Sequence, residues 1–222
     1  MSANEKSAAA DAHKEDILLA AVEVFGRSGY AAASTNEIVK QAKVSKGLLF
    51  HYFTNKEKLY TACFMYAMEK YGRFMAEQID LSSPDFFERI LTNLRTKMEF
   101  GCANKEFLAL TNRAWHMEGE VNPLTKPEAV SLVMQQMEGS PSSMAEAMEM
   151  TYLKGLDMSL FRKGVEPAKV MDYVGLALEA SWFRFTKKHQ GDIEAMVEDM
   201  DSYISEAEEI IVLMKSGAYI VD

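Results

Sequence analysis

The sequence contains little cysteine and little histidine, and this scarcity excludes several kinds of chemistry. It has 2 Cys and 4 His in 222 residues. Cys63 and Cys102 lack metal-type spacing, so we expect free, mostly buried thiols in a reduced compartment, the cytoplasm. A redox switch is the alternative, but nothing nearby in the sequence activates either thiolate. No Ser-His-Asp set, phosphate-binding loop or metal pattern is found, so we expect neither an enzyme nor a cofactor.

Long apolar runs and alternating segments are also absent. No apolar stretch reaches the ~20 residues that cross a bilayer, so we expect no membrane partner. Residues 1–12 are rich in Ala and Ser without the apolar core of a signal peptide, and we expect a disordered leader there. Sustained alternation of apolar and polar residues is missing, whereas helix formers dominate. The expected fold class is therefore all-α, with about nine helices.

Charge is distributed unevenly along the chain. The formal net charge is -9, which argues against indiscriminate binding of nucleic acid by the whole surface. Residues 1–60, however, hold 8 Lys and Arg against 7 Asp and Glu, and the remainder holds 16 against 26. Within residues 40–58 five lysines face a single glutamate. A local cationic patch on an acidic body can bind DNA on one face and repel it elsewhere.

Three short helices are predicted near the amino terminus. The first covers about residues 13–27, and Gly29 follows as its C-terminal stop. The second begins at Ser34, which forms a capping box with Glu37. Ser45 caps the third, a helix of roughly eight residues. The apolar face of the first helix repeats at helical spacing and consists of Ile17, Ala20, Ala21, Val24 and Phe25.

Longer helices follow in the remainder of the chain. A helix begins at Thr54 or Asn55, and Ser-Ser-Pro at residues 82–84 predicts another start, with Pro at the first helical position. We expect a disordered leader at 1–12, a helix-turn-helix domain at 13–58 and a larger helical ligand-binding and dimerisation domain at 59–222. The expected helices beyond the first three lie at about 56–79, 84–102, 105–117, 128–161, 168–189 and 192–215.

The third short helix has the residues that a DNA-reading element needs. The free amides at a helix N-terminus attract phosphate, and Ser45 can cap the helix and also donate to a phosphate oxygen. Lys46 extends from the first turn toward base edges, and Gly47 permits a close approach of the backbone to the duplex. His51 and Tyr52 project polar tips. Lys56, at the start of the next helix, is placed for the phosphate backbone, and Leu49 and Phe53 are expected to face inward.

Four stretches of the N-terminal part form a recognisable pattern: Ala20-Ala21-Val22-Glu23-Val24-Phe25-Gly26-Arg27-Ser28-Gly29-Tyr30, Ser34-Thr35-Asn36-Glu37-Ile38, Val44-Ser45-Lys46-Gly47-Leu48-Leu49-Phe50-His51-Tyr52-Phe53 and Asn55-Lys56-Glu57-Lys58-Leu59. Through these stretches residues 13–60 resemble the N-terminal domain of the TetR family of bacterial transcriptional regulators. Two positions depart from the family pattern. Phe50 stands where Tyr is common and cannot donate to phosphate, and Lys43 stands where Gly is common before the recognition helix.

The resemblance implies a role for each matching position. Base reading falls to Lys46 and Gly47, with Leu48 against a thymine methyl. Thr35 contacts phosphate, and Asn36 reaches a base or a phosphate. The predicted DNA-binding residues are therefore Thr35, Asn36, Ser45, Lys46, Gly47, Leu48, His51, Tyr52 and Lys56.

The helix predicted at 168–189 is apolar on several faces, and the last helix carries one long apolar stripe. A helix that is apolar on several faces must be buried on several faces, either within the chain or against a second copy. The resemblance implies that these two helices pair with their mates in a four-helix dimer interface, and we expect Val174, Leu178, Ile204 and Ile211 to contribute to it. A two-fold dimer would present two reading helices to half-sites about 34–36 Å apart or a multiple of that distance. The alternative is a monomer that buries both faces internally.

Methionine is abundant, with 16 in the chain, and every one except Met1 lies at position 65 or later. Flexible Met side chains suit a site for varied apolar ligands, but they also fill ordinary cores, and the sequence leaves both readings open. If an effector pocket exists, its expected lining includes Arg95, Met98, Trp115, His116 and Trp182, with Arg95 pairing an anionic head group. A metal site of His116, Glu118 and Glu120 is a weaker alternative, because no further clustered ligand completes it.

These observations predict a ligand-responsive transcriptional repressor. It would bind a palindromic double-stranded operator as a homodimer and be released by a small hydrophobic effector. Two rivals remain: a helical carrier of hydrophobic ligands without a DNA function, and an uncharacterised all-α enzyme. The lysines of residues 40–58 argue against both rivals.

Overall fold

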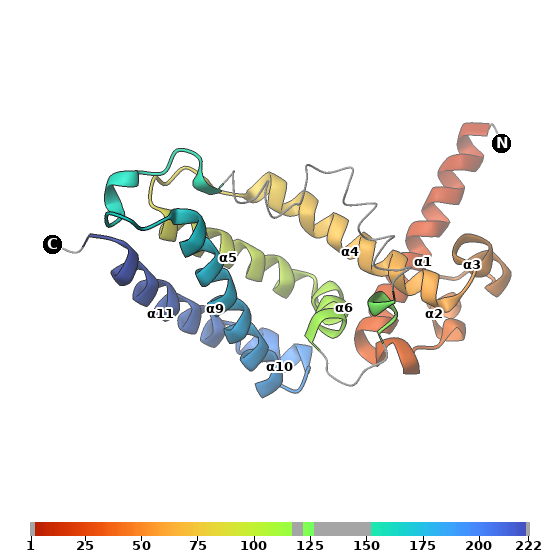
Figure 1. Ribbon diagram of the computed structural model, residues 1–222. Helices are drawn as coiled ribbons and strands as arrows, with labels where there is room; N and C mark the ends of the chain where they lie inside the picture. The colour runs from red at the N-terminus through yellow and green to blue at the C-terminus, as the bar shows by residue number, and fades with distance from the viewer. Residues whose placement is uncertain (1–2, 117–121, 127–151, 221–222) are drawn as a thin grey trace. The chain divides into compact units, whose positions relative to one another are not determined.

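Helices are the regular elements of the part of the chain that this computed structural model describes, residues 3–116, 122–126 and 152–220 (Figure 1). Apart from one isolated bridge between Phe161 and Tyr219, these residues contain no strand pairing, so the all-α prediction is confirmed. The helices are α1 (Ala3–Ala32), α2 (Thr35–Gln41), α3 (Lys46–Phe53), α4 (Lys56–Gln78), α5 (Phe86–Ala103), α6 (Lys105–His116), α9 (Pro167–Lys188), α10 (Ile193–Glu198) and α11 (Met200–Ala218), with short 3₁₀ helices η1 (Pro123–Thr125) and η2 (Met158–Leu160).

The chain forms two compact units. Unit 1 consists of Met1–Arg73 and Asn104–Val133, and unit 2 consists of Phe74–Ala103 and Met134–Asp222. The sequence predicted a domain boundary near residue 58. In the structure, the first part of α4 and all of α6 belong to the same unit as the N-terminal helices. The expected Met-rich helix falls mostly on residues 127–151, and that part of it lies outside the described residues.

Helix α1 begins at Ala3, ten residues before the expected start at His13 and inside the expected disordered leader. The leader is rich in Ala, which has the strongest intrinsic helix propensity. Gly29 interrupts the helix with φ 71° and ψ 169°, as expected of a glycine stop, but the chain resumes a helical turn that ends at Ala32. The predicted stop therefore acts as a kink.

The core of unit 1 forms from the faces that the helical pattern indicated. All five apolar residues predicted for the first helix are buried, as are Ile38 of α2 and both Leu49 and Phe53 of α3. Helix α6 packs closely on α1 at Gly26, where an added Cβ would lie 3.0 Å from Ala109 Cβ. Arg113 of α6 donates from Nε to the Gly26 carbonyl at 2.8 Å. This bond satisfies a carbonyl close to the kink at Gly29.

In unit 2, helix α11 packs against α9 and α5. Two details of the helix starts differ from expectation. Asp85, rather than the Ser-Ser-Pro segment, caps α5, since its Oδ1 accepts from the amides of Phe87 at 2.8 Å and Glu88 at 3.2 Å. The single helix expected at 192–215 is divided at Asp199, whose carboxylate bonds Lys188 Nζ at 2.7 Å and His189 Nε2 at 2.9 Å.

Arg89 of α5 is a buried cation, with 3% of its surface exposed. Its guanidinium donates to the carbonyls of Tyr152 at 2.9 Å and Lys154 at 2.7 Å, and to those of Ser83 and Gly155. Buried carbonyls that lose their donors are costly because they have left water without replacement partners. Arg89 therefore fastens the segment before η2 to α5.

We expect Arg89→Met to lower the free energy of unfolding by about 2–4 kcal/mol, because it leaves several carbonyls without donors. Arg95→Met, on the same helix, is the matched control. Arg95 is 53% exposed and pairs only across the surface with Glu208, so its loss should cost less than about 1 kcal/mol. Urea unfolding followed by circular dichroism measures both values. Equal losses in the two variants would contradict a fastening role for Arg89.

Candidate DNA-binding site

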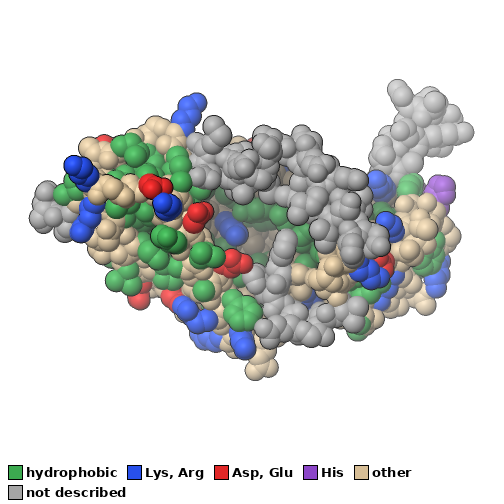
Figure 2. Space-filling view, in the orientation of Figure 1, with side chains coloured by type: hydrophobic (Ala, Val, Ile, Leu, Met, Phe, Trp, Pro, Cys, Tyr) green, Lys and Arg blue, Asp and Glu red, His purple; other side chains and the backbone are tan. Residues whose placement is uncertain are grey.

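Helices α2 and α3 form a helix-turn-helix in unit 1. The inner face of α3 is held by Leu49 and Phe53, which are buried as predicted. Its outer face carries Lys46, Gly47 and His51, which are exposed. Because the two faces alternate at helical spacing, burial of one fixes the direction of the other. Figure 2 shows Lys and Arg side chains on the surface of the helix-turn-helix region.

The two serine caps behave differently. Ser45 Oγ accepts from the amide of Leu48 at 3.1 Å, so the predicted cap of α3 is confirmed. Ser34 precedes α2 in extended conformation, but its side chain makes no capping bond. The predicted capping box is wrong because Glu37 instead accepts from Arg27 Nη2 at 2.5 Å. That ion pair links α1 to α2, and the sequence pattern could not reveal it.

The turn between α2 and α3 keeps its tight form although Lys43 replaces the glycine common in the family. Lys43 has φ 54°, in the left-handed region that favours glycine. The turn is closed by a bond from the amide of Val44 to the carbonyl of Val39 at 3.0 Å. The lysine therefore holds a strained backbone conformation that adds a cation beside the reading helix.

We expect Lys43→Gly to raise the free energy of unfolding by about 1 kcal/mol, because glycine adopts a left-handed conformation without the Cβ penalty. Lys40→Gly is the matched control: it removes the same charge from the last turn of α2 and should lower stability by up to about 1 kcal/mol. Thermal unfolding of both variants compares them directly. A stability loss for Lys43→Gly would show that the turn does not strain the lysine.

Most of the predicted DNA-binding residues lie on α2 and α3 or directly before α3. Asn36 is exposed on the first turn of α2, and its Oδ1 accepts from Lys46 Nζ at 3.0 Å. At Gly47 an added Cβ would meet only Ser45 Oγ, at 3.9 Å, among the described residues, so packing does not require this glycine. His51 contacts Tyr52 edge-on, with ring centroids 5.5 Å apart. Thr35 and Leu48 are half-buried.

Lys56 has a structural role that the sequence did not indicate. Its Nζ donates to the carbonyl of Ala31 at 3.1 Å and lies 4.9 Å from the centre of the Tyr30 ring. Burial lowers the pKa of this ammonium group. Asn55 caps the same helix, with Oδ1 accepting from the amide of Lys58 at 2.8 Å. Lys56 thus ties the start of α4 to the end of α1, which leaves its phosphate contact a prediction.

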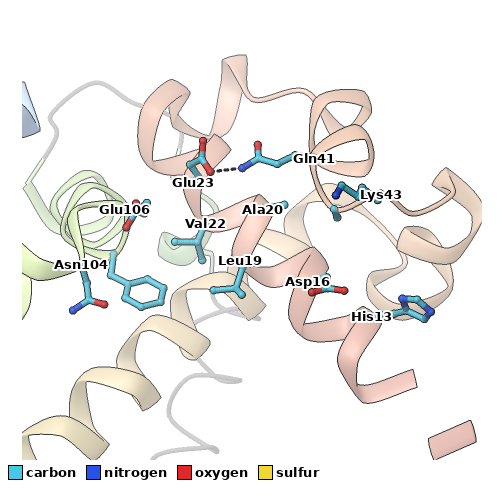
Figure 3. Close-up of a pocket in the computed structure, with 12 residues that line it drawn as sticks. His13, Asp16, Leu19, Ala20, Val22, Glu23, Gln41, Lys43, Asn104 and Glu106 are labelled. Carbon is cyan, nitrogen blue, oxygen red and sulfur yellow. Dashed lines mark hydrogen bonds between the residues drawn. The ribbon is translucent and has the colours of Figure 1, made fainter. Parts of the chain in front are cut away.

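A groove of about 650 Å³ lies beside this module in unit 1 (Figure 3). One edge is α1, with Asp16 and the exposed Leu19, and another is the start of α6, with Phe107. Gln41 donates to Glu23 across it. The lining mixes acids, bases and apolar groups and includes none of the predicted effector residues. The full lining is His13, Asp16, Leu19, Ala20, Val22, Glu23, Gln41, Ala42, Lys43, Asn104, Glu106 and Phe107.

The predicted effector residues have separate surroundings in the described structure. Arg95 is exposed and pairs with Glu208, so its guanidinium already has an anionic partner. Met98 is buried, and Trp182 stacks edge-on against Tyr203 with ring centroids 4.9 Å apart. The side chains of Trp115 and His116 lie outside the described residues. The pocket assignment therefore stays a prediction.

The structure also bears on the expected metal site, the two thiols and the membrane question. Glu118 and Glu120 lie outside the described residues, and the searched part of the structure contains no cluster of metal-binding side chains. No disulfide joins Cys63 and Cys102, and burial raises the pKa of the Cys63 thiol well above its usual value. None of the described helices combines the length and apolar character needed to cross a bilayer.

The predicted dimer residues differ in their burial within the single chain. Val174 and Ile211 are 1% and 4% exposed and belong to the core of unit 2, so their packing inside the subunit already accounts for them and their part in a dimer interface stays a prediction. Leu178 and Ile204 are half-buried, and Leu178 packs on the same core. Both faces of α9 are apolar, and the sequence pattern did not show which one is internal. The exposed apolar residues of α9 and α11 are Tyr173 (59%), Leu176 (64%), Val212 (64%) and Leu213 (71%).

The arrangement so far defines a helix-turn-helix protein with a short, outward-facing cationic reading helix. Residues 17–63 match the family model described as bacterial regulatory proteins, tetR family. The chain is 30% identical over 127 residues to the uncharacterized HTH-type transcriptional regulator YhgD of Bacillus subtilis (strain 168). The aligned residues make up 57% of this chain and 62% of that protein. It is 47% identical over 47 residues to the HTH-type transcriptional regulator QacR of Staphylococcus aureus (strain Mu50), covering 21% and 25%.

The likeness of fold extends along most of the chain. The crystal structure of a putative tetR family transcription regulator from Shewanella sp. PV-4 matches with a TM-score of 0.60 and 17% identity, over 94% of this chain and 99% of that one. The two curated matches each span less than two thirds of the relative's length. These findings confirm the predicted resemblance of the N-terminal residues to the TetR family, and the solved structure shows that the fold of the chain is similar to that of a TetR-type regulator along most of its length.

Proposed function

We propose that this protein is a transcriptional repressor that binds a palindromic operator as a homodimer. The observation that carries the proposal is the outer face of α3, where Lys46 and Gly47 stand exposed on a helix anchored by the buried Leu49 and Phe53. A short rigid helix fits the major groove, and a lysine in its first turn can reach base edges. The curated relatives named above are described as transcriptional regulators, which supports the same class.

Dimerisation is supported by the apolar surface of unit 2. Tyr173 and Leu176 of α9 and Val212 and Leu213 of α11 leave more than half of their surfaces exposed. Figure 2 shows hydrophobic side chains gathered over the part of unit 2 that contains these helices. Exposed apolar groups on two packed helices gain free energy when a second copy covers them. We call these four residues the α9–α11 apolar face.

The effector part of the proposal concerns unit 2 and the helices that connect the units. A small hydrophobic ligand would favour a state in which the two reading helices no longer match successive major grooves. The ligand can shift this equilibrium only by as much as it prefers that state over the DNA-bound one. The abundance of methionine from position 65 onward supports the binding of such a ligand, because flexible thioethers adapt to varied apolar ligands.

The rival functions make different predictions. A helical carrier without a DNA function would hold apolar molecules and ignore duplex DNA, whereas an enzyme would turn its ligand over. The exposed lysines of residues 40–58 favour the regulator, because a carrier or an enzyme has no use for cations grouped around a helix-turn-helix.

The decisive test is selection of bound duplexes from a random DNA pool. We expect the protein to recover a palindrome, and Lys46→Ala to lose about 1–3 kcal/mol of preference at one position of each half-site. Lys56→Ala should weaken binding to all sequences and reduce the salt dependence. Lys163→Ala, an exposed lysine of unit 2, is the control and should bind as the wild type does. Failure of the folded, ligand-free protein to bind any duplex at low salt would refute the proposal.

The dimer is tested by placing a charge on the α9–α11 apolar face. Leu176→Asp should convert a dimer of 25.0 kDa chains into single chains, because a buried unpaired carboxylate is costly. Met158→Asp is the control: Met158 is an exposed apolar residue of η2, outside this face, and the variant should remain dimeric. Light scattering after size exclusion reports the mass. A monomeric wild-type protein would contradict this interface. A Leu176→Asp variant that is still a dimer would contradict it as well.

A further inference from the structure

A hydrogen bond joins the starts of the two helices of the helix-turn-helix. Lys46 is the first residue of α3 and Asn36 is the second of α2, and Lys46 Nζ donates to Asn36 Oδ1 at 3.0 Å. Both side chains are exposed, and they lie ten positions apart in the sequence. The resemblance to the TetR family gives each residue its own contact with DNA, whereas the structure shows them as a bonded pair.

The bond is not needed to hold the two helices together. Ile38 of α2 and Leu49 of α3 are fully buried in the same core, and the turn is closed by the bond between the backbones of Val44 and Val39. An exposed side-chain bond adds little to the stability of such a packed pair, since water competes for both partners. Its consequence is the direction in which the lysine points.

Lysine has a flexible four-carbon stem, and fixing its rotamers costs entropy when it contacts a ligand. A bond that already restricts the side chain in the free protein removes part of that cost from DNA binding. Asn36 can do this without neutralising the ammonium, because its carboxamide is uncharged. The positive charge therefore remains available to the duplex.

The number of donors then selects the base. An ammonium group has three N–H donors, and one is used by Asn36 Oδ1, so two remain. In the major groove guanine presents two acceptors, N7 and O6, whereas adenine presents one acceptor beside a donor. Thymine offers one acceptor, and cytosine offers a donor. The two remaining N–H groups thus match guanine best.

We propose that Asn36 is a positioning residue that presents Lys46 to a guanine in each operator half-site, and that the Asn36–Lys46 pair determines this base preference. The inference rests on the proposed function and adds to it the identity of one base and the residue that orients its reader. It assigns Asn36 an effect on preference through Lys46 instead of an independent DNA contact.

The experiment first identifies the guanine of the selected operator for which Lys46→Ala loses its preference. It then measures binding of the full chain to this operator duplex and to the same duplex with adenine or 7-deazaguanine at that position. The wild type should bind guanine about tenfold or more tightly than either replacement. Asn36→Ala should lose most of this preference while keeping the wild-type thermal stability. Lys163→Ala, which removes an exposed lysine of unit 2, is the control and should keep the preference.

Two further variants separate positioning from direct contact. In the Lys46→Ala background, Asn36→Ala should change the guanine preference no further, because the pair acts as one unit. Asn36→Asp keeps an oxygen acceptor for Lys46, so it should retain the guanine preference while its negative charge weakens binding to every duplex. A preference unchanged in Asn36→Ala would overturn the inference, as would independent, additive losses in the double variant.

The proposed function and the inference fail in different ways. A wild type that binds no duplex overturns the proposed function and the inference with it. A wild type that selects a palindrome in which no base preference depends on Lys46, or in which that base is not guanine, overturns the inference alone. The inference is supported if Asn36→Ala loses the guanine preference while its affinity for unselected duplexes stays unchanged.

Discussion

Burial of one face of an eight-residue helix is the constraint on which the DNA-reading surface depends. A helix shorter than about 12–15 residues is marginally stable in water on its own, so α3 exists because Leu49 and Phe53 pack into the core of unit 1. That packing determines which residues remain outside. Lys46, Gly47 and His51 are exposed as a direct consequence, and their chemistry is presented on a helix that cannot rotate without opening the core.

Polar contacts near the kink in α1 stabilise this arrangement. Gly29 interrupts the helix, and carbonyl groups on either side of the interruption find donors on other helices. Arg113 of α6 binds Gly26, and Lys56 of α4 binds Ala31. Lys56, which the sequence predicts to contact the phosphate backbone, therefore also joins the start of α4 to the end of α1.

Helices α9 and α11 have apolar side chains both in the core of unit 2 and on its surface. Their internal face closes unit 2 through residues such as Val174 and Ile211, while the α9–α11 apolar face stays open in the single chain. Helices that are apolar on two sides can satisfy one side within the chain and the other against a second copy. This division gives the proposed dimer a surface that is separate from the residues that fold the subunit.

The sequence by itself determined the features that depend on residues close together in the chain. Helical type, the cap at Ser45, the interruption at Gly29 and the inward face of α3 follow from spacings of three or four residues and from local backbone preference, although the helical turn after Gly29 was not predicted. The family resemblance of residues 13–60 is likewise local. The predicted DNA-reading residues followed from this part of the chain.

Only the tertiary structure decided the features that depend on residues far apart in the chain. Glu37 bonds Arg27 instead of closing a capping box, and the break at Asp199 follows bonds to the end of α9. Which apolar face of α9 lies inside unit 2 is set by its packing against α11. Periodicity shows that a helix has apolar faces, but the choice among them is made by the free energy of packing against partners that the local sequence does not contain.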